Sequence, residues 1–520
     1  MKAAGAAVNR PMITLCVMAA TIMQALDTTI ANVATPYMQG SFSASQDQIN
    51  WVLTSYIVAA AIMTPPTGWL ANHLGRKRLF LISVVGFTIA SALCGLASSL
   101  TQIVAFRLMQ GLFGAALVPL SQSVLLDIYP REKQGAAMAM WGVGVTVGPI
   151  LGPALGGFLT ENFGWRWVFY INLPVGVLTY LGISSFLEET RRGIAGKFDW
   201  FGFGMLSLAV GSLQMMLDRG ELLDWFSSLE IVIEGSVAVV AFYLFVVHTA
   251  TAGAAGKGSF LSAALFRDRN CVAGMVATLC VGVVLYASLS LISPFLQTLL
   301  GYPVVSAGLI IAPRGMGTML AMLLVGRIVR FVDPRHILLA GFALTAFALW
   351  RMSLFNLNVS EGTLIWVGVL QGFGLGLLFA PLSAVSFSTL PAHLRTEAAG
   401  LFSLMRNVGG SVGIAIVTSL LVSNTQANRA TIGAHVTAFE PAFKMEQVLR
   451  FWNPFTAQGQ AALADEISRQ ASLIAYLDNF RLLMVIALLS MPAALLLKTP
   501  KNRKPGQGKA PPPATPAVAD

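Results

Sequence analysis

Asp27 and Arg107 are the residues whose types and positions point most directly to chemistry. Each lies inside a long apolar segment, Asp27 within 12–34 and Arg107 within 101–126. An ionised side chain at the centre of a bilayer costs about 2.5–3.5 kcal/mol on insertion scales, so such residues usually have a function. Burial favours the protonated form of a carboxylate, whereas a nearby cation favours its release. We therefore predict that Asp27 exchanges a proton; the alternative is a hydrogen bond that holds its helix against a neighbour.

Arg107 cannot deprotonate, so it needs an acid, backbone carbonyls or water as a partner. We predict that Arg107 adjusts the proton affinity of a nearby acid, and Asp27 is the candidate for this acid. The alternative is that its side chain extends toward the membrane interface. Arg406, which lies near the start of the apolar segment 399–423, is a candidate for a hinge or gate.

Other polar and aromatic residues within apolar segments are candidates for the wall of a substrate cavity, although each alone is more often a packing residue. They are Gln24, Asn32, Tyr56, Gln110, Phe113, Gln122, Trp141, Tyr286 and Gln297. Glu234 is a further acid near the end of its segment. The histidines are scattered and the cysteines have no metal-ligand spacing. We therefore expect no enzyme activity, cofactor or metal site.

The elements that must position these residues are membrane helices. Of the 520 residues, 56% are apolar and 11% are charged, against about 25% charged in an ordinary soluble domain. A helix needs about twenty mostly apolar residues to cross a bilayer. Fourteen segments meet this test: 12–34, 50–71, 79–98, 101–126, 136–160, 166–187, 200–217, 229–249, 271–299, 305–329, 335–355, 362–389, 399–423 and 478–497.

The basic residues indicate the orientation of these segments. The net charge of +10 suggests a nucleic-acid partner, but the Lys and Arg residues lie in alternate short loops and in the tails. Cytoplasmic loops are the ones enriched in these residues. We therefore predict that both termini are cytoplasmic and that no nucleic acid binds. The segment 423–477 then becomes one long periplasmic loop.

Two stretches of the sequence resemble each other. Gln110-Gly111 is followed by Pro119-Leu120-Ser121, and Gln371-Gly372 is followed by Pro381-Leu382-Ser383. These stretches lie eight helices apart, whereas a simple duplication of six helices would separate them by six. Repeated halves around a central site are typical of secondary transporters.

We therefore predict an all-α membrane protein with two six-helix halves and two inserted central helices. The predicted regions are a cytoplasmic N-terminus (1–11), an N-terminal half (12–187), an inserted region (188–270), a C-terminal half with the long periplasmic loop (271–497) and a disordered cytoplasmic tail (498–520).

Six stretches of the sequence form motifs: Leu26 to Pro36, Gly68 to Arg78, Arg107 to Gly111, Gly148 to Gly157, Trp165 to Pro174 and Leu217 to Trp225. These motifs resemble those of the major facilitator superfamily, and most closely its fourteen-helix drug:proton antiporter branch of the EmrB/QacA type. The resemblance implies gating roles for Gly68, Asn72, Gly75, Arg76, Lys77, Arg78, Gly148, Gly152, Pro153, Gly156 and Gly157. Asn72 departs from the family, which usually has an Asp at this position and uses its charge to latch one conformation. The latch is then either weaker here or formed by another acid.

The resemblance implies proton-coupled efflux of drugs or toxic compounds across the bacterial inner membrane by alternating access. The sequence contains no Walker A motif, so we do not expect ATP hydrolysis. A dedicated exporter of a metabolite or siderophore is the alternative on the same fold, and a non-transporting sensor is a third.

EmrB-type pumps of double-membrane bacteria work with an EmrA-like periplasmic adaptor and an outer-membrane channel. The resemblance therefore also implies these partners, with the loop 423–477 as the docking element.

Overall fold

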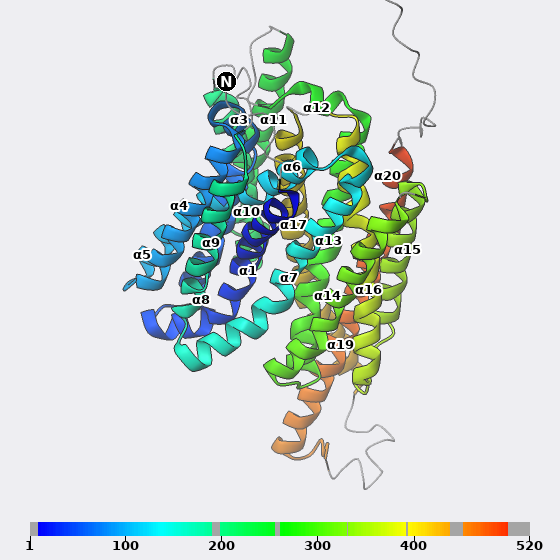
Figure 1. The fold of residues 1–520 in the computed structure, drawn as a ribbon. Coiled ribbons are helices and arrows are strands. Elements are labelled where there is room, and N and C mark those ends of the chain that lie inside the picture. The colour runs from blue at the N-terminus through cyan, green and yellow to red at the C-terminus, as the bar shows by residue number, and fades with distance from the viewer. Residues whose placement is uncertain are drawn as a thin grey trace, which may run out of the picture.

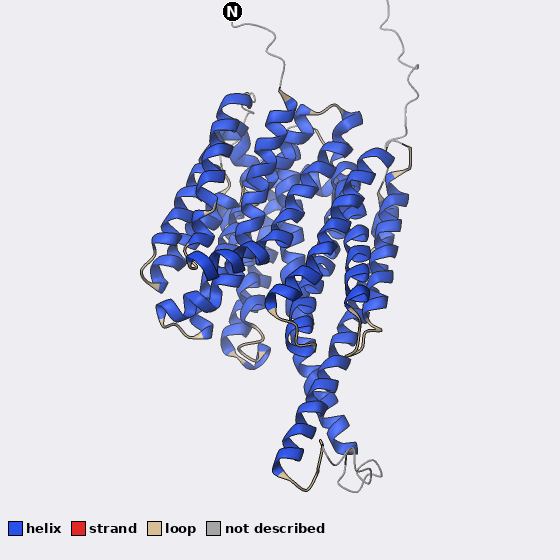
Figure 2. Ribbon diagram, turned by 60° about the horizontal axis from the view of Figure 1, so that its bottom comes forward, coloured by secondary structure: helices blue, strands red, loops and turns tan. Residues whose placement is uncertain are grey.

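The computed structural model describes residues 9–189, 198–254, 261–329, 331–391, 394–436 and 451–497. Within these ranges the regular elements are all helices, and they run roughly parallel as one bundle (Figure 1). The first and last described residues lie at the same end of this bundle (Figure 2). We call it the basic end, because the loops predicted to be cytoplasmic lie there.

The N-terminal half contains nine helices, several of which are broken pieces of one membrane span. They are α1 (Arg10–Phe42), α2 (Gln46–Met63), α3 (Thr67–Leu74), α4 (Arg76–Leu96), α5 (Leu100–Gly114), α6 (Leu117–Ile128), α7 (Arg131–Phe163), α8 (Trp167–Tyr170) and α9 (Asn172–Phe186).

The inserted region contributes α10 (Trp200–Arg219), a short 3-10 turn (Trp225–Ser227), α11 (Leu229–Ala254) and α12 (Ala263–Arg267). Helices α10 and α11 pack against each other, and α10 also contacts α2 and α17. The hydroxyl of Ser411 on α17 donates to Gln214 Oε1 on α10 at 2.9 Å. Helix α11 keeps large apolar side chains exposed, such as Val239 at 70% and Phe242 at 55%. Such a face suits contact with lipid.

The C-terminal half repeats the architecture of the first. Its elements are α13 (Arg269–Pro294), a π-helical turn (Phe295–Leu299), α14 (Val304–Ile328), α15 (Pro334–Met352), α16 (Glu361–Ser388), α17 (Arg395–His435), α19 (Ala457–Leu489) and α20 (Met491–Leu496).

Local sequence signals explain where several helices begin and end. The Ser45 hydroxyl accepts from Gln48 N, and the Gln48 side chain accepts from Ser45 N, which is a capping box at the start of α2. The Asp268 carboxylate caps α13 by accepting from Cys271 N at 2.8 Å. Gly75 has φ +91° between α3 and α4, a conformation that side chains other than glycine rarely adopt.

All fourteen predicted segments lie in these helices. By length and apolar composition, eleven of the described helices qualify as membrane spans, or twelve when the bent pair α2–α3 counts as one. The predicted all-α membrane architecture is therefore confirmed, and the count of fourteen is compatible with it.

The buried apolar residues divide the bundle into a shared core and two separate ones. One cluster joins both halves and includes Leu125 and Trp141 with Leu378 and Phe402. Away from the basic end, Ile30 and Phe169 belong to a core of the N-terminal half. The corresponding core of the C-terminal half is a different cluster. The two halves are thus packed together most closely toward the basic end.

The segment 423–477 differs from the predicted loop because much of it is helical. Helix α17 continues to His435 and α19 begins at Ala457, and together they extend past the other helices as a projecting hairpin (Figure 2). At about 1.5 Å per residue, the 41 residues of α17 span about 60 Å, which is twice the thickness of the hydrocarbon core. The Asn428 side chain donates to Ala471 O at 3.5 Å and ties the two helices together.

Residues 437–450, the N-terminal residues 1–8 and the predicted tail 498–520 lie outside the described residues.

Candidate functional site

A buried ion pair joins the two residues that the sequence singled out. Arg107 Nη1 on α5 lies 2.6 Å from Asp27 Oδ2 on α1, and the side chains are 1% and 0% exposed. The predicted partnership of these residues is therefore present in the geometry. A buried charge left without a partner is strongly destabilising, so each residue makes the other tolerable inside the bundle.

Two amides complete the surroundings of the carboxylate. Gln110 Nε2 donates to Asp27 Oδ1 at 2.8 Å, and Asn172 Nδ2 donates to the same oxygen at 3.0 Å. Asn172 begins α9 and also donates to Ser91 Oγ on α4 at 3.0 Å. Asn172 lies within the Trp165–Pro174 motif, and its role was not predicted from the sequence. Its only local signal was an amide at the start of an apolar segment.

Arg107 has further partners besides the carboxylate. Its Nε donates to Val52 O at 3.1 Å and its Nη1 donates to Gln110 Oε1 at 2.8 Å. Its guanidinium also lies 4.4 Å from the ring centroid of Tyr56, a cation–π distance. The arginine would therefore keep hydrogen-bond partners if Asp27 were neutral.

The predicted cavity residues fall into separate groups. Gln24 donates to Tyr56 Oη at 3.2 Å, so Gln24, Tyr56 and Gln110 surround the ion pair. Gln122 and Trp141 line a cavity between the halves. The other four lie apart: Phe113 packs toward Gly86, Tyr286 toward Gly410, Gln297 donates to Ser293 Oγ at 2.9 Å, and Asn32 is exposed.

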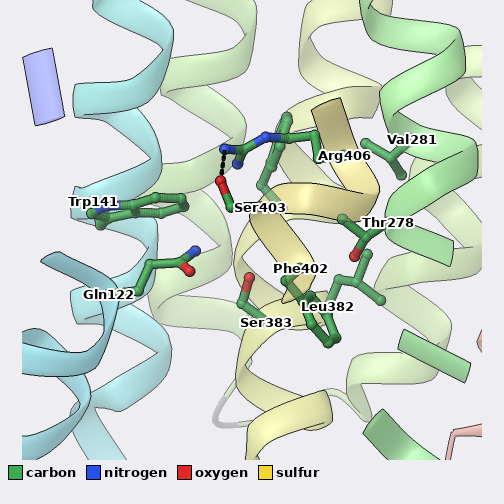
Figure 3. A pocket seen from close by; sticks show the side chains of 10 residues that line it. Gln122, Trp141, Thr278, Val281, Leu382, Ser383, Phe402, Ser403 and Arg406 are labelled. Atoms are coloured by element: carbon green, nitrogen blue, oxygen red, sulfur yellow. Dashed lines mark hydrogen bonds between the residues drawn. The ribbon is translucent and has the colours of Figure 1, made fainter. Parts of the chain in front are cut away.

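The cavity that includes Gln122 and Trp141 has a volume of about 20 Å³ (Figure 3). Its other walls come from the C-terminal half and include Arg406, the residue predicted as a hinge or gate. The complete lining is Gln122, Trp141, Thr278, Val281, Phe379, Leu382, Ser383, Phe402, Ser403 and Arg406.

Polar contacts hold the N-terminal and C-terminal halves together at the basic end. Asp127 pairs with Arg76 of its own half, and its other oxygen lies 3.6 Å from Arg395 Nη1 of the opposite half. Ser123 and Thr396 share a hydrogen bond of 2.7 Å across the same boundary. Asp127 therefore supplies a carboxylate between the halves, close to the loop in which Asn72 replaces the family's acid.

The other residues of this loop motif contact their surroundings in different ways. A Cβ on Gly68 would lie 2.6 Å from Glu397 Cα, so this glycine allows α3 to approach α17. Lys77 Nζ donates to Ser184 O at 2.7 Å. The backbone N–H groups of Lys77 and Arg78 donate to the Glu189 carboxylate at 3.2 and 3.3 Å.

The glycines of α7 allow it to pack closely against α1 beside Asp27. A Cβ on Gly148 would clash with the backbone of Ala25, and one on Gly152 would clash with the Thr29 hydroxyl. Gly156 has Ile30 as its neighbour at 3.0 Å, whereas Gly157 has open space. The side chain of Pro153 lies outside the described residues. Close helix approach is the usual use of small residues in membranes.

A larger cavity of about 310 Å³ opens near the opposite end, between α2 and the end of α10. It is formed in part by the motif from Leu217 onward. The Thr54 hydroxyl donates to the Asp218 carboxylate, and Arg219 pairs with Glu230. Glu234, on the same helix as Glu230, has a buried carboxylate oxygen without a partner among the described residues.

Comparison with known proteins agrees with this architecture. The model of the family described as Major Facilitator Superfamily matches residues 17–414. The human organic anion transporter MFSD10 (TETRAN) aligns with a TM-score of 0.59 at 15% identity, over 92% of this chain and 99% of that one. At this identity the likeness concerns the fold alone. The chain belongs to the Major Facilitator Superfamily, a family of membrane transporters, and is a multi-pass membrane protein.

The similarity extends to one branch of the family. The chain is 36% identical to the multidrug export protein EmrB of Escherichia coli (strain K12) over 501 residues, which cover 96% of this chain and 97% of EmrB. It is 34% identical to the fatty acid resistance protein FarB of Neisseria gonorrhoeae, over 94% of this chain and 96% of FarB. The resemblance to the EmrB-type branch that the motifs indicated is thereby confirmed.

Proposed function

We propose that this transporter is a proton-coupled multidrug efflux antiporter that works by alternating access, with Asp27 as the residue that exchanges the proton. The similarity to EmrB along nearly the whole chain supports efflux of several compounds. The observation that carries the assignment of Asp27 is its fully buried ion pair with Arg107.

The surroundings of Asp27 suit a group that changes its charge. In the ionised state the carboxylate accepts hydrogen bonds from Arg107, Gln110 and Asn172. When a proton neutralises Asp27, Arg107 retains Val52 O and the Gln110 side chain as acceptors. The cluster therefore has partners in both states, and protonation loosens the link between α1 and α5. Arg107 takes part in the exchange as the ion-pair partner of Asp27.

The membrane potential is a sufficient energy source for this exchange. It supplies about 2.3 kcal/mol per charge and 100 mV. At about 150 mV one proton supplies about 3.5 kcal/mol, which corresponds to about 300-fold accumulation at perfect coupling.

The remaining motifs supply the gate and the cavity in this proposal. The loop residues Gly68, Asn72, Gly75, Arg76, Lys77 and Arg78 act at the basic end, where Asp127 joins the halves. The glycines of α7 let it slide against α1. Gln24, Tyr56 and Gln110 surround the ion pair and respond to the state of Asp27.

The loop charges support an inner-membrane position with both termini in the cytoplasm. In that orientation the hairpin of α17 and α19 projects into the periplasm, where it is placed to dock an EmrA-like adaptor that leads to an outer-membrane channel. Replacement of 423–477 by a short linker should abolish co-purification of such an adaptor. An adaptor that still co-purifies with the shortened chain would exclude the hairpin as its docking site.

The coupling residue is tested by proton flux in reconstituted vesicles that contain a pH dye. A panel of lipophilic cations and weak acids is added to vesicles with wild type, Asp27→Asn and Asp27→Glu. We expect substrate-triggered proton flux in wild type, a loss of at least about 100-fold in Asp27→Asn, and partial flux in Asp27→Glu, which keeps a titratable group. Flux that survives in Asp27→Asn would assign the proton to another acid, with Glu234 as the next candidate.

The same panel separates the alternatives. A response to many unrelated compounds supports multidrug efflux, whereas a response to one compound supports the dedicated metabolite or siderophore exporter. Substrate exchange that persists in Asp27→Asn without proton flux would show that the variant is folded.

A further inference from the structure

Arg406 stands out because it is a buried cation that has no carboxylate partner among the described residues. The residue is 8% exposed, and its recorded hydrogen bond is from Nη2 to Ser403 Oγ at 3.4 Å. Its Nε is buried without an acceptor among the described residues. A guanidinium has five N–H donors, and burial without compensation is costly. Arg107, by contrast, has both a carboxylate and carbonyl partners.

The unpaired guanidinium lies in the wall of the cavity between the halves. Its side chain extends from α17 toward Trp141 on α7 (Figure 3). Gln122 on α6 and Ser383 on α16 supply further hydrogen-bonding groups. Arg406 is the one charged residue in the described lining, so the cavity has a positive charge and no acid to balance it.

The apolar half of the lining is largely aromatic. Phe379, Leu382 and Phe402 face the cavity together with the ring of Trp141. The Trp141 Nε1 is buried and has no acceptor in the part of the chain that the structure describes, so it is a further donor available beside the guanidinium. Cavities with apolar walls and a few convergent polar groups are typical of small-molecule sites. The complementary ligand has an acceptor-rich negative group and an apolar body.

We propose that this cavity binds the carboxylate, or another anionic group, of an amphipathic substrate through Arg406, so that Arg406 is the residue that distinguishes negatively charged from neutral substrates. The inference rests on the proposed efflux function and adds the chemistry of recognition to it. Arginine suits this role because its planar fork binds a carboxylate through two parallel hydrogen bonds.

The volume of the cavity indicates which state of the transporter binds the acid. About 20 Å³ suffices for a water molecule and excludes an organic acid. Residues from both halves enclose it, on the side where Asp127 and Arg395 hold the basic end closed. Separation of the halves at this end enlarges the cavity and exposes Arg406, and closure contracts it. The acid therefore binds from the basic end and is expelled by closure, which is the direction that export needs.

Equilibrium binding of two matched probes tests the proposal. Pyrenebutyrate and pyrenebutanol share their ring and chain and differ in the negative charge. We measure binding to the purified full-length chain in nanodiscs, with empty nanodiscs subtracted. Wild type should bind the acid at least about tenfold more tightly than the alcohol, equivalent to about 1.4 kcal/mol. Arg406→Gln should remove this preference and leave alcohol binding unchanged, and Arg406→Lys should retain part of it.

Two more variants make the test independent of how well Arg406→Gln folds. Ser383→Asp keeps Arg406 but places a carboxylate in the cavity, and it should weaken binding of the acid alone. Arg314→Gln is the matched control, because Arg314 is another buried arginine of this half that lies outside the cavity lining. It should leave the preference intact.

Three results would overturn the proposal. They are equal binding of the two probes to wild type, equal weakening of both probes in Arg406→Gln, and a preference that disappears in Arg314→Gln but survives in Arg406→Gln. Binding needs no proton gradient, so Asp27→Asn should keep the preference for the acid. A failure of proton coupling would thus appear as missing flux with an intact preference, which distinguishes it from a failure of the anion site.

Discussion

The two halves use the same packing device around their repeated Gln-Gly pairs. A Cβ on Gly111 of α5 would clash with the carbonyl oxygen of Tyr56 on α2, and a Cβ on Gly372 of α16 would clash with the carbonyl oxygen of Arg314 on α14. In both places a glycine lets one helix backbone approach another. The repeat is therefore a repeat of helix contacts.

The charges at these contacts are different. Arg107 lies three residues before Gln110, whereas Gly368 lies three residues before Gln371. The cation of the C-terminal half comes instead from Arg314, which is buried and donates to Ser288 Oγ at 2.9 Å. Both amide atoms of Gln371 lack partners among the described residues, whereas Gln110 bonds to Asp27 and Arg107.

This difference indicates how the two halves of a duplicated fold can have different functions. The N-terminal half contains a compensated pair in which a proton can change the balance. The C-terminal half contains Arg406, a buried cation in the cavity wall without a carboxylate at ion-pair distance among the described residues, which suits this cavity to anionic ligands. Helix packing determines where the buried polar residues lie, and the residue types at a few of these positions determine whether the site holds an ion pair or an unbalanced cation.

Removal of the two buried arginines should give the largest contrast. Arg107→Gln leaves Asp27 buried without its cation and should lower the free energy of unfolding by about 3–5 kcal/mol. Arg314→Gln removes a cation that has no carboxylate partner among the described residues, and it should change the free energy of unfolding by less than about 1 kcal/mol. Unfolding of purified protein in detergent, followed by circular dichroism, measures both. Equal losses would mean that Arg314 is compensated as well as Arg107.

Substitution of the two packing glycines should give intermediate and similar effects. Gly111→Ala and Gly372→Ala each force a methyl group against a carbonyl oxygen and should cost about 1–3 kcal/mol. Gly157→Ala is the matched control, since it has open space and gains helix propensity of up to about 1 kcal/mol. The comparison of melting temperatures checks all three. A large cost in one half alone would contradict the equivalence of the two contacts.

Loss of the hydrogen bonds around the two arginine sites should give the smallest contrast. Asn172→Ala removes a donor to the ionised Asp27 and should cost about 1.5–3 kcal/mol, whereas Ser288→Ala removes one neutral acceptor from Arg314 and should cost about 0.5–1.5 kcal/mol. Denaturant midpoints at constant slope measure the difference. A reversed order would locate the stronger electrostatic cluster in the C-terminal half.

The sequence by itself determined that this protein lies in a membrane, and it determined the fold and the family. Long apolar segments, basic loops and repeated Gln-Gly pairs are local properties, and a bilayer requires each segment to satisfy its own backbone as a helix. Asp27 and Arg107 were also visible locally, because a charge inside an apolar segment is conspicuous.

Only the tertiary structure decided which distant residues meet. Arg107 and Asp27 are 80 positions apart, and Asn172 reaches the same carboxylate from 145 positions away. The unpaired state of Arg406, its place in a cavity between the halves and the helical hairpin in 423–477 likewise had no local signal. The hydropathy of a segment shows whether it can span the bilayer. Which side chains contact each other depends on which helix faces pack together, and this is determined by the packing of the whole bundle.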